Sequence, residues 1–190
     1  MKKNLSFLLS FLLAANVFAQ YKYEKEFRIG ETEVPEKAVS FVDSLDFGTK
    51  VRWYREVGYD TISFEAKTRY DRQRYSIEFS ADGTFEDVEM GISADDIPLA
   101  TYNLMSAYLQ SEHGKYRIDK IQVQYSGDPG TVLAFLRKEG NPESMVIHYE
   151  MVISTKIEGS WVMMEYLFSE AGEFVRRSKM TLKRTDNIEF

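Results

Sequence analysis

The sequence predicts an α+β protein of two tandem units, each a helix packed on an antiparallel sheet of four or more strands. Three observations predict this fold. Two segments repeat apolar residues with a helical period, most of the rest alternates with a period of two, and one seven-residue motif occurs twice. We expect residues 1–19 to be a signal peptide, residues 20–93 to form the first unit, and residues 94–190 to form a second, enlarged unit.

The first nineteen residues have the pattern of an export signal. Lys2 and Lys3 precede an apolar run over residues 5–13, and Ala19 offers a small residue before a predicted cleavage at the Ala19–Gln20 bond. A membrane anchor is the weaker alternative, because a spanning helix needs about 20 apolar residues. No cysteine follows the run, so lipid attachment through a cysteine is excluded. We expect a periplasmic or secreted protein.

The composition narrows the classes of partner. Removal of residues 1–19 takes away Lys2 and Lys3 and no acid, which leaves 22 basic and 30 acidic residues and a formal charge of −8. Such a chain is poorly suited to nucleic acid, whose binding depends on neutralising phosphates. With no cysteine there is no disulfide, so 13 Phe, 12 Tyr and 2 Trp must supply the core.

In the first unit, residues 21–29 are predicted to form a short strand and residues 34–45 a helix. The helix has one apolar face, with Pro35 in its first turn and Gly48 beyond its end. Its apolar residues are Val34, Ala38, Phe41, Val42 and Leu45. Residues 62–66, 75–79 and 85–90 alternate as strands, with a polar hairpin tip at 70–73 and an Asp82-Gly83 turn.

The second unit is predicted to begin with a helix over residues 96–113, opened by Pro98 and followed by Gly114, with Asp95 or Asp96 as its N-cap. Residues 131–136 are apolar on both sides and are predicted to form a strand. In the strand over residues 161–168, one face is formed by Val162, Met164, Tyr166 and Phe168.

The two units share short motifs in the same order. Val34-Pro35 is matched 63 positions later by Ile97-Pro98, and the motif Phe-Ser-x-x-Gly-x-Phe begins at Phe79 and again 89 positions later. The offset grows by 26, so the second unit has extra chain, which we place at loops 126–130 and 140–142. The repeat favours an internal duplication.

The first unit resembles a known family. Its motifs are Val34-Pro-x-x-Ala38, Lys50-Val-Arg-Trp53-Tyr, Phe64-Glu-Ala-Lys67 and Tyr75-Ser-Ile-Glu-Phe79-x-x-Asp-Gly83. They are similar to the PepSY-like, β-lactamase-inhibitor-like family of periplasmic proteins, clearly over residues 34–90 and more weakly over 97–180. The resemblance implies tandem helix-and-sheet units and, by analogy of fold alone, binding through a concave sheet surface and loops. No inhibitory contact residue carries over.

Residues for catalysis are scarce. His113, at a helix end, and His148, in a strand, are the only near-neutral bases, and ordinary structural roles are the default for both. No zinc motif, nucleophile elbow or phosphate loop is present, so we expect no enzyme activity, no metal and no cofactor. The carboxylates are read as a solvated strand face and a helix cap, with an adventitious calcium site as the alternative: Glu86, Asp87, Glu89, Asp95 and Asp96.

The best candidate binding surface is the second face of the strand over residues 161–168. Trp161, Met163 and Leu167 lie there, and burial within the monomer, a second copy or a partner could cover them. Loop residues Tyr70, Arg72 and Asp128 are further candidates. Arg69, Arg72 and Arg74 make a basic hairpin tip, which could contact an acidic partner or serve only as a soluble turn.

These observations favour a non-enzymatic module that binds a protein or peptide, an inhibitor being one form of it. Two alternatives stay open. One is a carrier or sensor of a small apolar ligand held between helix and sheet, which requires an enclosed apolar pocket of at least about 300 Å³. The other is a hydrolase with two carboxyl groups facing one cleft.

Overall fold

A computed structural model describes residues 20–22, 25–140 and 145–180. Within them the chain forms ten strands, three α-helices and two short 3-10 helices, an α+β fold. The predicted signal peptide, most of loop 140–142 and the end of the second unit lie outside the described residues. All ten strands belong to one sheet in the order β1-β10-β9-β8-β7-β6-β5-β4-β3-β2, and every neighbouring pair is antiparallel except β1 with β10.

The strands are β1 (Gln20–Lys22), β2 (Lys25–Ile29), β3 (Arg52–Val57), β4 (Ile62–Tyr70), β5 (Gln73–Ser80), β6 (Phe85–Gly91), β7 (Tyr116–Ser126), β8 (Val146–Ile157), β9 (Ser160–Ser169) and β10 (Phe174–Met180). The helices are η1 (Glu31–Glu33), α1 (Glu36–Ser44), η2 (Ala94–Asp96), α2 (Leu99–His113) and α3 (Pro129–Leu136). Both predicted long helices are therefore present.

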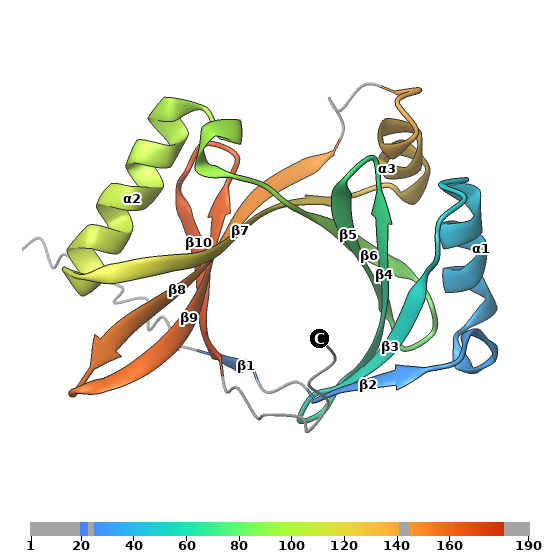
Figure 1. Ribbon diagram of the computed structural model, residues 1–190, viewed down its shortest axis with the longest axis horizontal. Helices are drawn as coiled ribbons and strands as arrows, with labels where there is room; N and C mark the ends of the chain where they lie inside the picture. Colours follow the sequence, from blue (N-terminus) through green and yellow to red (C-terminus); the bar gives the residue numbers. More distant parts are fainter. Residues whose placement is uncertain (1–19, 23–24, 141–144, 181–190) are drawn as a thin grey trace, which may run out of the picture.

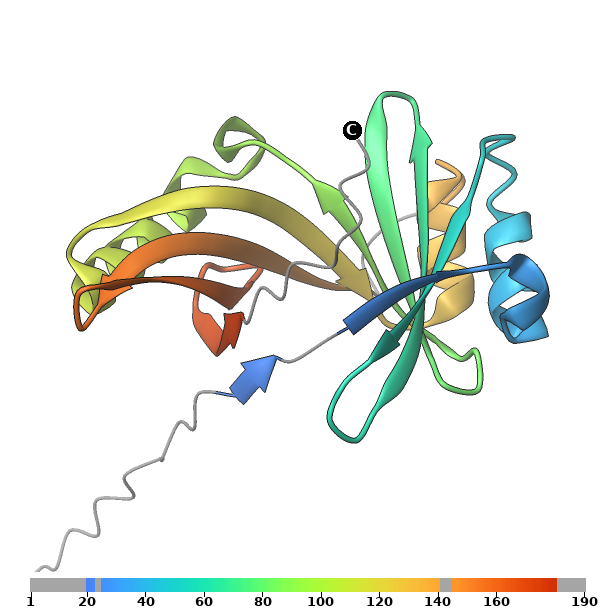
Figure 2. The ribbon, with the colours of Figure 1, turned by 60° about the horizontal axis from the view of Figure 1, so that its bottom comes forward.

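The sheet curls around a central space, and all three α-helices lie on its outer, convex side (Figure 1). The curl brings the two edges of the sheet close together. β1 pairs with β10 at one edge, and β2 pairs with β3 at the other. The last residue of β1, Lys22, and the first residue of β2, Lys25, are nevertheless only three positions apart. Three residues of extended chain span about 10 Å. The single strand predicted over residues 21–29 is thus two strands at opposite edges, as Figure 2 also shows.

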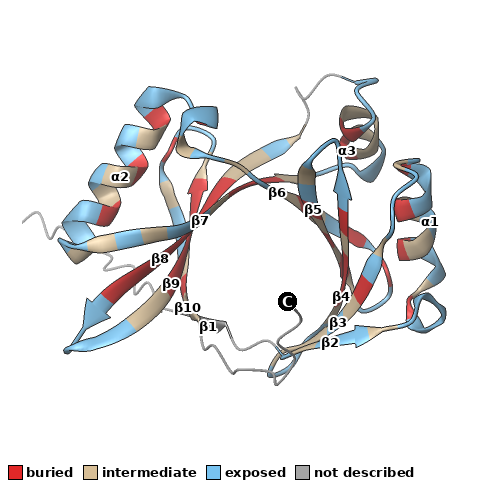
Figure 3. Ribbon diagram, in the orientation of Figure 1, coloured by how far each residue is buried: buried red, intermediate tan, exposed pale blue. Residues whose placement is uncertain are grey.

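The convex face carries two hydrophobic cores, and the buried residues of the helices are turned toward the sheet (Figure 3). The first core centres on Phe79, which is fully buried on β5. Phe41 of α1 meets its ring edge-on at 5.7 Å, and Trp53 lies 6.0 Å away between ring centroids. These aromatic contacts fix α1 against β3–β5.

The second core lies under α2. Met105 and Leu109 of this helix are fully buried against Tyr166 and Phe168 of β9, on the strand face that the alternation predicted to be apolar. His113, the last residue of α2, shares a 2.5 Å hydrogen bond between its Nε2 and the Tyr166 hydroxyl. The structural contact of His113 is therefore a side-chain contact to the sheet.

The segment predicted as an apolar strand over residues 131–136 is instead the helix α3. Asp128 is its N-cap, since its Oδ1 accepts hydrogen bonds from the Thr131 backbone N–H at 2.9 Å and the Thr131 hydroxyl at 3.0 Å, and Pro129 occupies the first turn. A short run that is apolar on all sides does not distinguish a buried strand from a buried helix. Val132 and Leu136 of α3 pack into the first core, beside α1.

The helix α2 also begins differently from the prediction. Its N-cap is Pro98, which makes no side-chain cap, whereas Asp95 and Asp96 lie in η2. Asp96 accepts hydrogen bonds from the Ser93 backbone N–H at 2.8 Å and the Ser93 hydroxyl at 2.7 Å. The carboxylate therefore caps the 3-10 helix that precedes α2.

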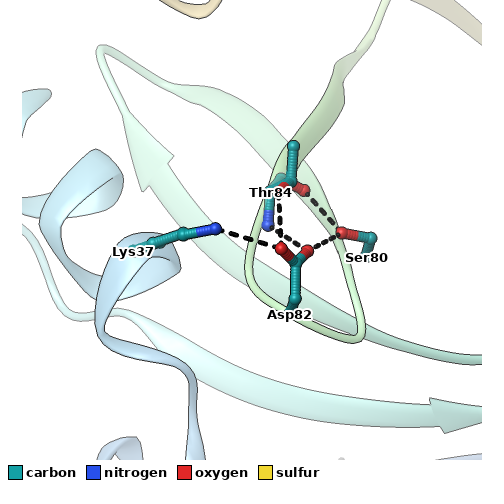
Figure 4. A network of polar contacts seen from close by, with 4 residues as sticks. All are labelled: Lys37, Ser80, Asp82 and Thr84. Atoms are coloured by element: carbon teal, nitrogen blue, oxygen red, sulfur yellow. Dashed lines mark hydrogen bonds and ion pairs between the residues drawn. The ribbon is translucent and has the colours of Figure 1, made fainter.

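The Asp82-Gly83 turn is present between β5 and β6, and it docks α1 on the sheet. Asp82 accepts hydrogen bonds from the Ser80 hydroxyl at 2.7 Å and from both the backbone N–H and the hydroxyl of Thr84 at 3.1 Å (Figure 4). It also pairs with Lys37 of α1 at 3.0 Å. The hydrogen bonds from Ser80, Lys37 and Thr84 hold the pKa of Asp82 well below its usual value.

Candidate functional site

The register of the strands assigns each side chain to one of the two faces. On the concave face, charged and polar residues follow one another across the sheet: Tyr54, Glu65, Glu78 and Asp87 are cross-strand partners on β3 to β6. On β7 to β9, Gln122 and Glu150 continue the polar residues of this face, and Leu167 is the next cross-strand partner. No α-helix of the described residues lies on this side (Figure 1).

Carboxylates gather in one part of the concave face. Oxygen atoms of Glu26, Glu56 and Glu65 lie within 4.8 Å of one another, which is close enough for a shared metal ion. However, the ammonium of Lys67 already pairs with this group. It bonds to Glu26 and lies 2.8 Å from Glu65 Oε2. Burial disfavours the charged form of Lys67, but the two carboxylates outweigh burial and raise its pKa.

Glu78 lies in the same acidic region. Its pKa is raised well above the usual 4.5, first by burial and then by repulsion from neighbouring carboxylates, Glu56 and Glu65 foremost. A carboxyl group with a raised pKa in the folded state destabilises the fold at pH values where the unfolded chain ionises freely. Ionised Glu78 therefore costs stability above about pH 4.5, and the cost grows as the pH rises toward its folded-state pKa.

We expect Glu78→Gln to raise the free energy of unfolding at pH 7 and to lose this advantage below pH 4.5, where both proteins carry a neutral side chain. Urea denaturation at pH 4 and pH 7 measures the difference. Glu173→Gln, at an exposed glutamate between β9 and β10, is the control and should change little. An equal gain at both pH values would contradict the electrostatic cause.

Basic residues gather at the other end of the same face, near the β4–β5 hairpin. They line a cleft of about 970 Å³ formed by β3 to β7. Its cationic residues are Lys50, Arg52, Lys67, Arg69, Arg74 and Lys120. Two carboxylates, Glu89 and Asp119, also line it, and apolar wall is supplied by Ile92, Ile118 and Ile121. We call this the basic cleft.

Asp119 is largely satisfied by its neighbours. Its Oδ1 accepts a 2.7 Å hydrogen bond from Arg117 Nε, and its Oδ2 accepts one from the Ser154 hydroxyl. Asp119 is therefore engaged by two neighbours, and Glu89 is the other carboxylate that lines the basic cleft.

The structure separates the predicted binding residues of β9. Trp161 is 69% exposed, with Lys156 Nζ 5.3 Å above its ring, and Met163 is half-buried. Leu167 is only 6% exposed, opposite Arg176 of β10. Trp161 and Met163 are therefore not ordinary core, whereas Leu167 offers almost no surface.

The predicted loop residues lie in a different part of the sheet, at the β4–β5 hairpin. Tyr70 stacks on Phe47 with ring centroids 4.3 Å apart, and Arg72 is exposed. Asp71 and Arg72 both have positive φ, 47° and 66°, the signature of a type I′ turn. Asp128, the third loop candidate, is the N-cap of α3.

Sequence reasoning missed most of the basic cleft. The sequence places Arg69 and Arg74 in a basic hairpin tip but assigns no role to Lys50, Arg52 and Lys120. Part of the signal is present as alternation, because Lys67 and Arg69 are two positions apart on β4 and so project to one face of the strand.

His148 lies on the concave face, opposite Gln124 and Ser169, as the alternation of its strand predicts. Burial, and then the charge of Arg176, lower its pKa. It is far in the strand order from the acidic region, which involves β2 to β6. His113 contacts Tyr166 on the convex side instead, so the two histidines do not share a site.

No protein-family model matches the sequence, and no curated protein matches it. The chain is similar in fold to three solved Bacteroides proteins. A DUF2874 family protein from Bacteroides ovatus is 12% identical with a TM-score of 0.49, covering 77% of this chain and 87% of its own. A candidate periplasmic protein from Bacteroides eggerthii is 13% identical with a TM-score of 0.49, covering 77% and 88%. A BLIP-like protein from Bacteroides fragilis is 15% identical with a TM-score of 0.45, covering 80% and 90%.

One of the three is described as BLIP-like, and none carries the PepSY name. Within the described residues, no helix combines the length and the apolar character needed to cross a membrane.

Proposed function

We propose that this chain is an exported, non-enzymatic module that binds a protein or peptide partner through the concave face of its sheet and the adjoining hairpins. The observation that carries the proposal is the exposed Trp161 at the end of the concave face, 69% accessible beside half-buried Met163. Tryptophan is among the residues most enriched at binding hot spots, and methionine is enriched in interfaces. Tyr70 and Arg72 add contacts at the β4–β5 hairpin. Inhibition of the bound partner is one outcome that the proposal includes.

Two features favour binding over the alternatives. A carrier of an apolar ligand needs an enclosed apolar pocket of at least about 300 Å³. The basic cleft is lined by charges, and a second cavity, of about 290 Å³, is bordered by Gln73 and Asp96 as well as by apolar residues such as Met90 and Val123. A hydrolase needs two free carboxyl groups in one cleft, and Asp119 is already engaged.

We also infer that the first and second units are copies of one ancestral unit. Gly83 and Gly172 occupy equivalent turns, with φ of 82° and 86°. Each packs against the helix of its own unit, Gly83 near Ala38 and Gly172 near Thr101. Ala38 and Thr101 are 63 positions apart, the same offset that relates the two helix starts. Since the strands form one sheet, the duplication would have joined two meanders edge to edge.

The test is affinity capture from an envelope extract of the source organism with residues 20–190 as bait. We expect a reproducible protein or peptide partner, and we expect Trp161→Ala to weaken its binding at least about tenfold, as truncation of a hot-spot tryptophan does. Leu99→Ala is the matched control, because Leu99 is 74% exposed but lies on α2, on the convex side. Equal losses in both variants, or recovery of no partner by the wild-type bait, would refute the proposal.

A further inference from the structure

The basic cleft concentrates positive charge on a protein that is acidic as a whole. Five of its cations make no ion pair or side-chain hydrogen bond with any part of the chain that the structure describes: Lys50, Arg52, Arg69, Arg74 and Lys120. All five are exposed. The sixth, Lys67, is held by Glu65 and Glu26. Only Glu89 opposes the five free cations within the cleft, because Asp119 is engaged by Arg117.

The cations are placed against one another rather than dispersed. Arg69 of β4 stands directly opposite Arg74 of β5, and Arg52 of β3 stands opposite Lys67 of β4. Like charges at directly opposed positions destabilise a sheet. Glu26 and Glu65 already offset the charge of Lys67. The sequence therefore accepts a cost in stability at the Arg69–Arg74 pair, which an anionic ligand would relieve.

A buried polar group in the wall also lacks a partner. Gln122 is 4% exposed and lines the basic cleft, and its side-chain oxygen accepts no hydrogen bond within the chain. An unpaired buried amide group is costly unless a ligand or water satisfies it. Its amide can present either its oxygen or its N–H₂ to a bound group, since the two orientations occupy the same space.

The extent of the cleft indicates the shape of the ligand. The strands that form it run from β3 to β7. These two outer strands are four inter-strand steps apart, which is about 19 Å at the usual spacing of strands. A single phosphate or carboxylate contacts only one part of such a row. An extended peptide of about six residues has the matching length. Ile92, Ile118 and Ile121 provide apolar wall for the aliphatic parts of its side chains.

The charge of the whole protein limits the ligand to a short polyanion. The mature chain has a formal charge of −8, and the acidic region around Glu65 and Glu78 adjoins the basic cleft on the same face. A long polyanion such as nucleic acid would be repelled beyond the cleft. Arginine and lysine recognise carboxylates well, with arginine able to bond both oxygens at once.

We propose that the basic cleft binds a short acidic peptide segment, with its carboxylates on Arg52, Arg69, Arg74 and Lys120. This inference rests on the proposed function and names the chemistry of the partner segment. Binding should be strongly salt-dependent, because the cations are exposed.

The test uses hexaglutamate, hexalysine and pyrophosphate as probes of the mature protein, in calorimetry at low salt. We expect hexaglutamate to bind in the micromolar range, hexalysine not to bind at the cleft, and pyrophosphate to bind at least about tenfold more weakly. Arg69→Gln with Arg74→Gln should abolish hexaglutamate binding without loss of thermal stability, since it removes an opposed like-charge pair. Glu89→Gln should tighten binding by removing the opposing charge.

The control Lys25→Gln with Lys115→Gln removes the same number of charges outside the cleft and should leave hexaglutamate binding unchanged. Equal loss in this control, tighter binding of pyrophosphate than of hexaglutamate, or no hexaglutamate binding would each overturn the inference. If hexaglutamate fails while the Trp161-dependent partner is still captured, the proposed function stands and only the acidic ligand is wrong.

Discussion

Replacing Phe79 with alanine is expected to lower the free energy of unfolding by about 3–5 kcal/mol, the range for removing a large aromatic side chain from a packed core. Phe79 is fully buried, and it contacts Phe41 of α1, Trp53 of β3 and Phe85 of β6. The cavity left by the missing ring would lie where α1, β3 and β6 meet. A movement of any single element therefore cannot close it. Chemical denaturation followed by circular dichroism measures the loss.

Phe27→Ala is the matched control for Phe79→Ala. The same atoms are removed, but Phe27 is 36% exposed on β2, where it stacks under Lys25 and Arg55. We expect a loss of about 1 kcal/mol or less, as for most substitutions near the surface. Comparable losses at the two positions would show that Phe79 is not the centre of the first core.

The second large effect is expected at a turn. Gly83 has φ of 82°, and a Cβ added there would lie 2.6 Å from the Cβ of Pro35, at the start of α1. Gly83→Ala must therefore accept a left-handed backbone, which costs about 1–2 kcal/mol, and must also push α1 away from the sheet, which costs about 1–3 kcal/mol more. We expect a total loss of about 2–5 kcal/mol in the free energy of unfolding.

Gly159→Ala separates the two causes. Gly159, in the β8–β9 hairpin, has the same φ of 82°, but a Cβ there would have nothing within 4 Å. Only the backbone cost applies, so a loss of about 1–2 kcal/mol is expected. Gly172→Ala should behave like Gly83→Ala, because its Cβ would lie 2.8 Å from the Thr101 carbonyl oxygen of α2. Identical losses at Gly83 and Gly159 would rule out close packing of the turn against α1.

Local signals predicted the elements of the fold well. Period-two alternation identified β4, β5, β6 and β9, and the helical spacing identified α1 and α2, because both patterns follow from one buried face per element. The failure at α3 had a physical reason, since its apolar run has no polar face from which to read a period. An Asp128-Pro129 pair ahead of Thr131 was the available sign of a helix start.

Long-range features could not be read in the same way. The division of residues 20–29 between the two edges of the sheet depends on curvature, which no local pattern records. Of the candidate binding residues on β9, Trp161 and Met163 keep accessible surface and Leu167 is buried, and their role in binding stays a prediction. Asp128 looked like a free loop carboxylate, and its role as a cap depended on recognising α3. The basic cleft required the register of β3 to β7, which brings residues from distant parts of the sequence to one place.

The pairing of β1 with β10 means that the first strand that the structure describes waits for the last one to be synthesised. Every neighbouring pair from β2 to β10 joins consecutive strands, which a growing chain can assemble in order. β1 also shields an edge of β10 that would otherwise be open to strand addition by another molecule. Loss of β1 is therefore expected to leave that edge open and to favour self-association.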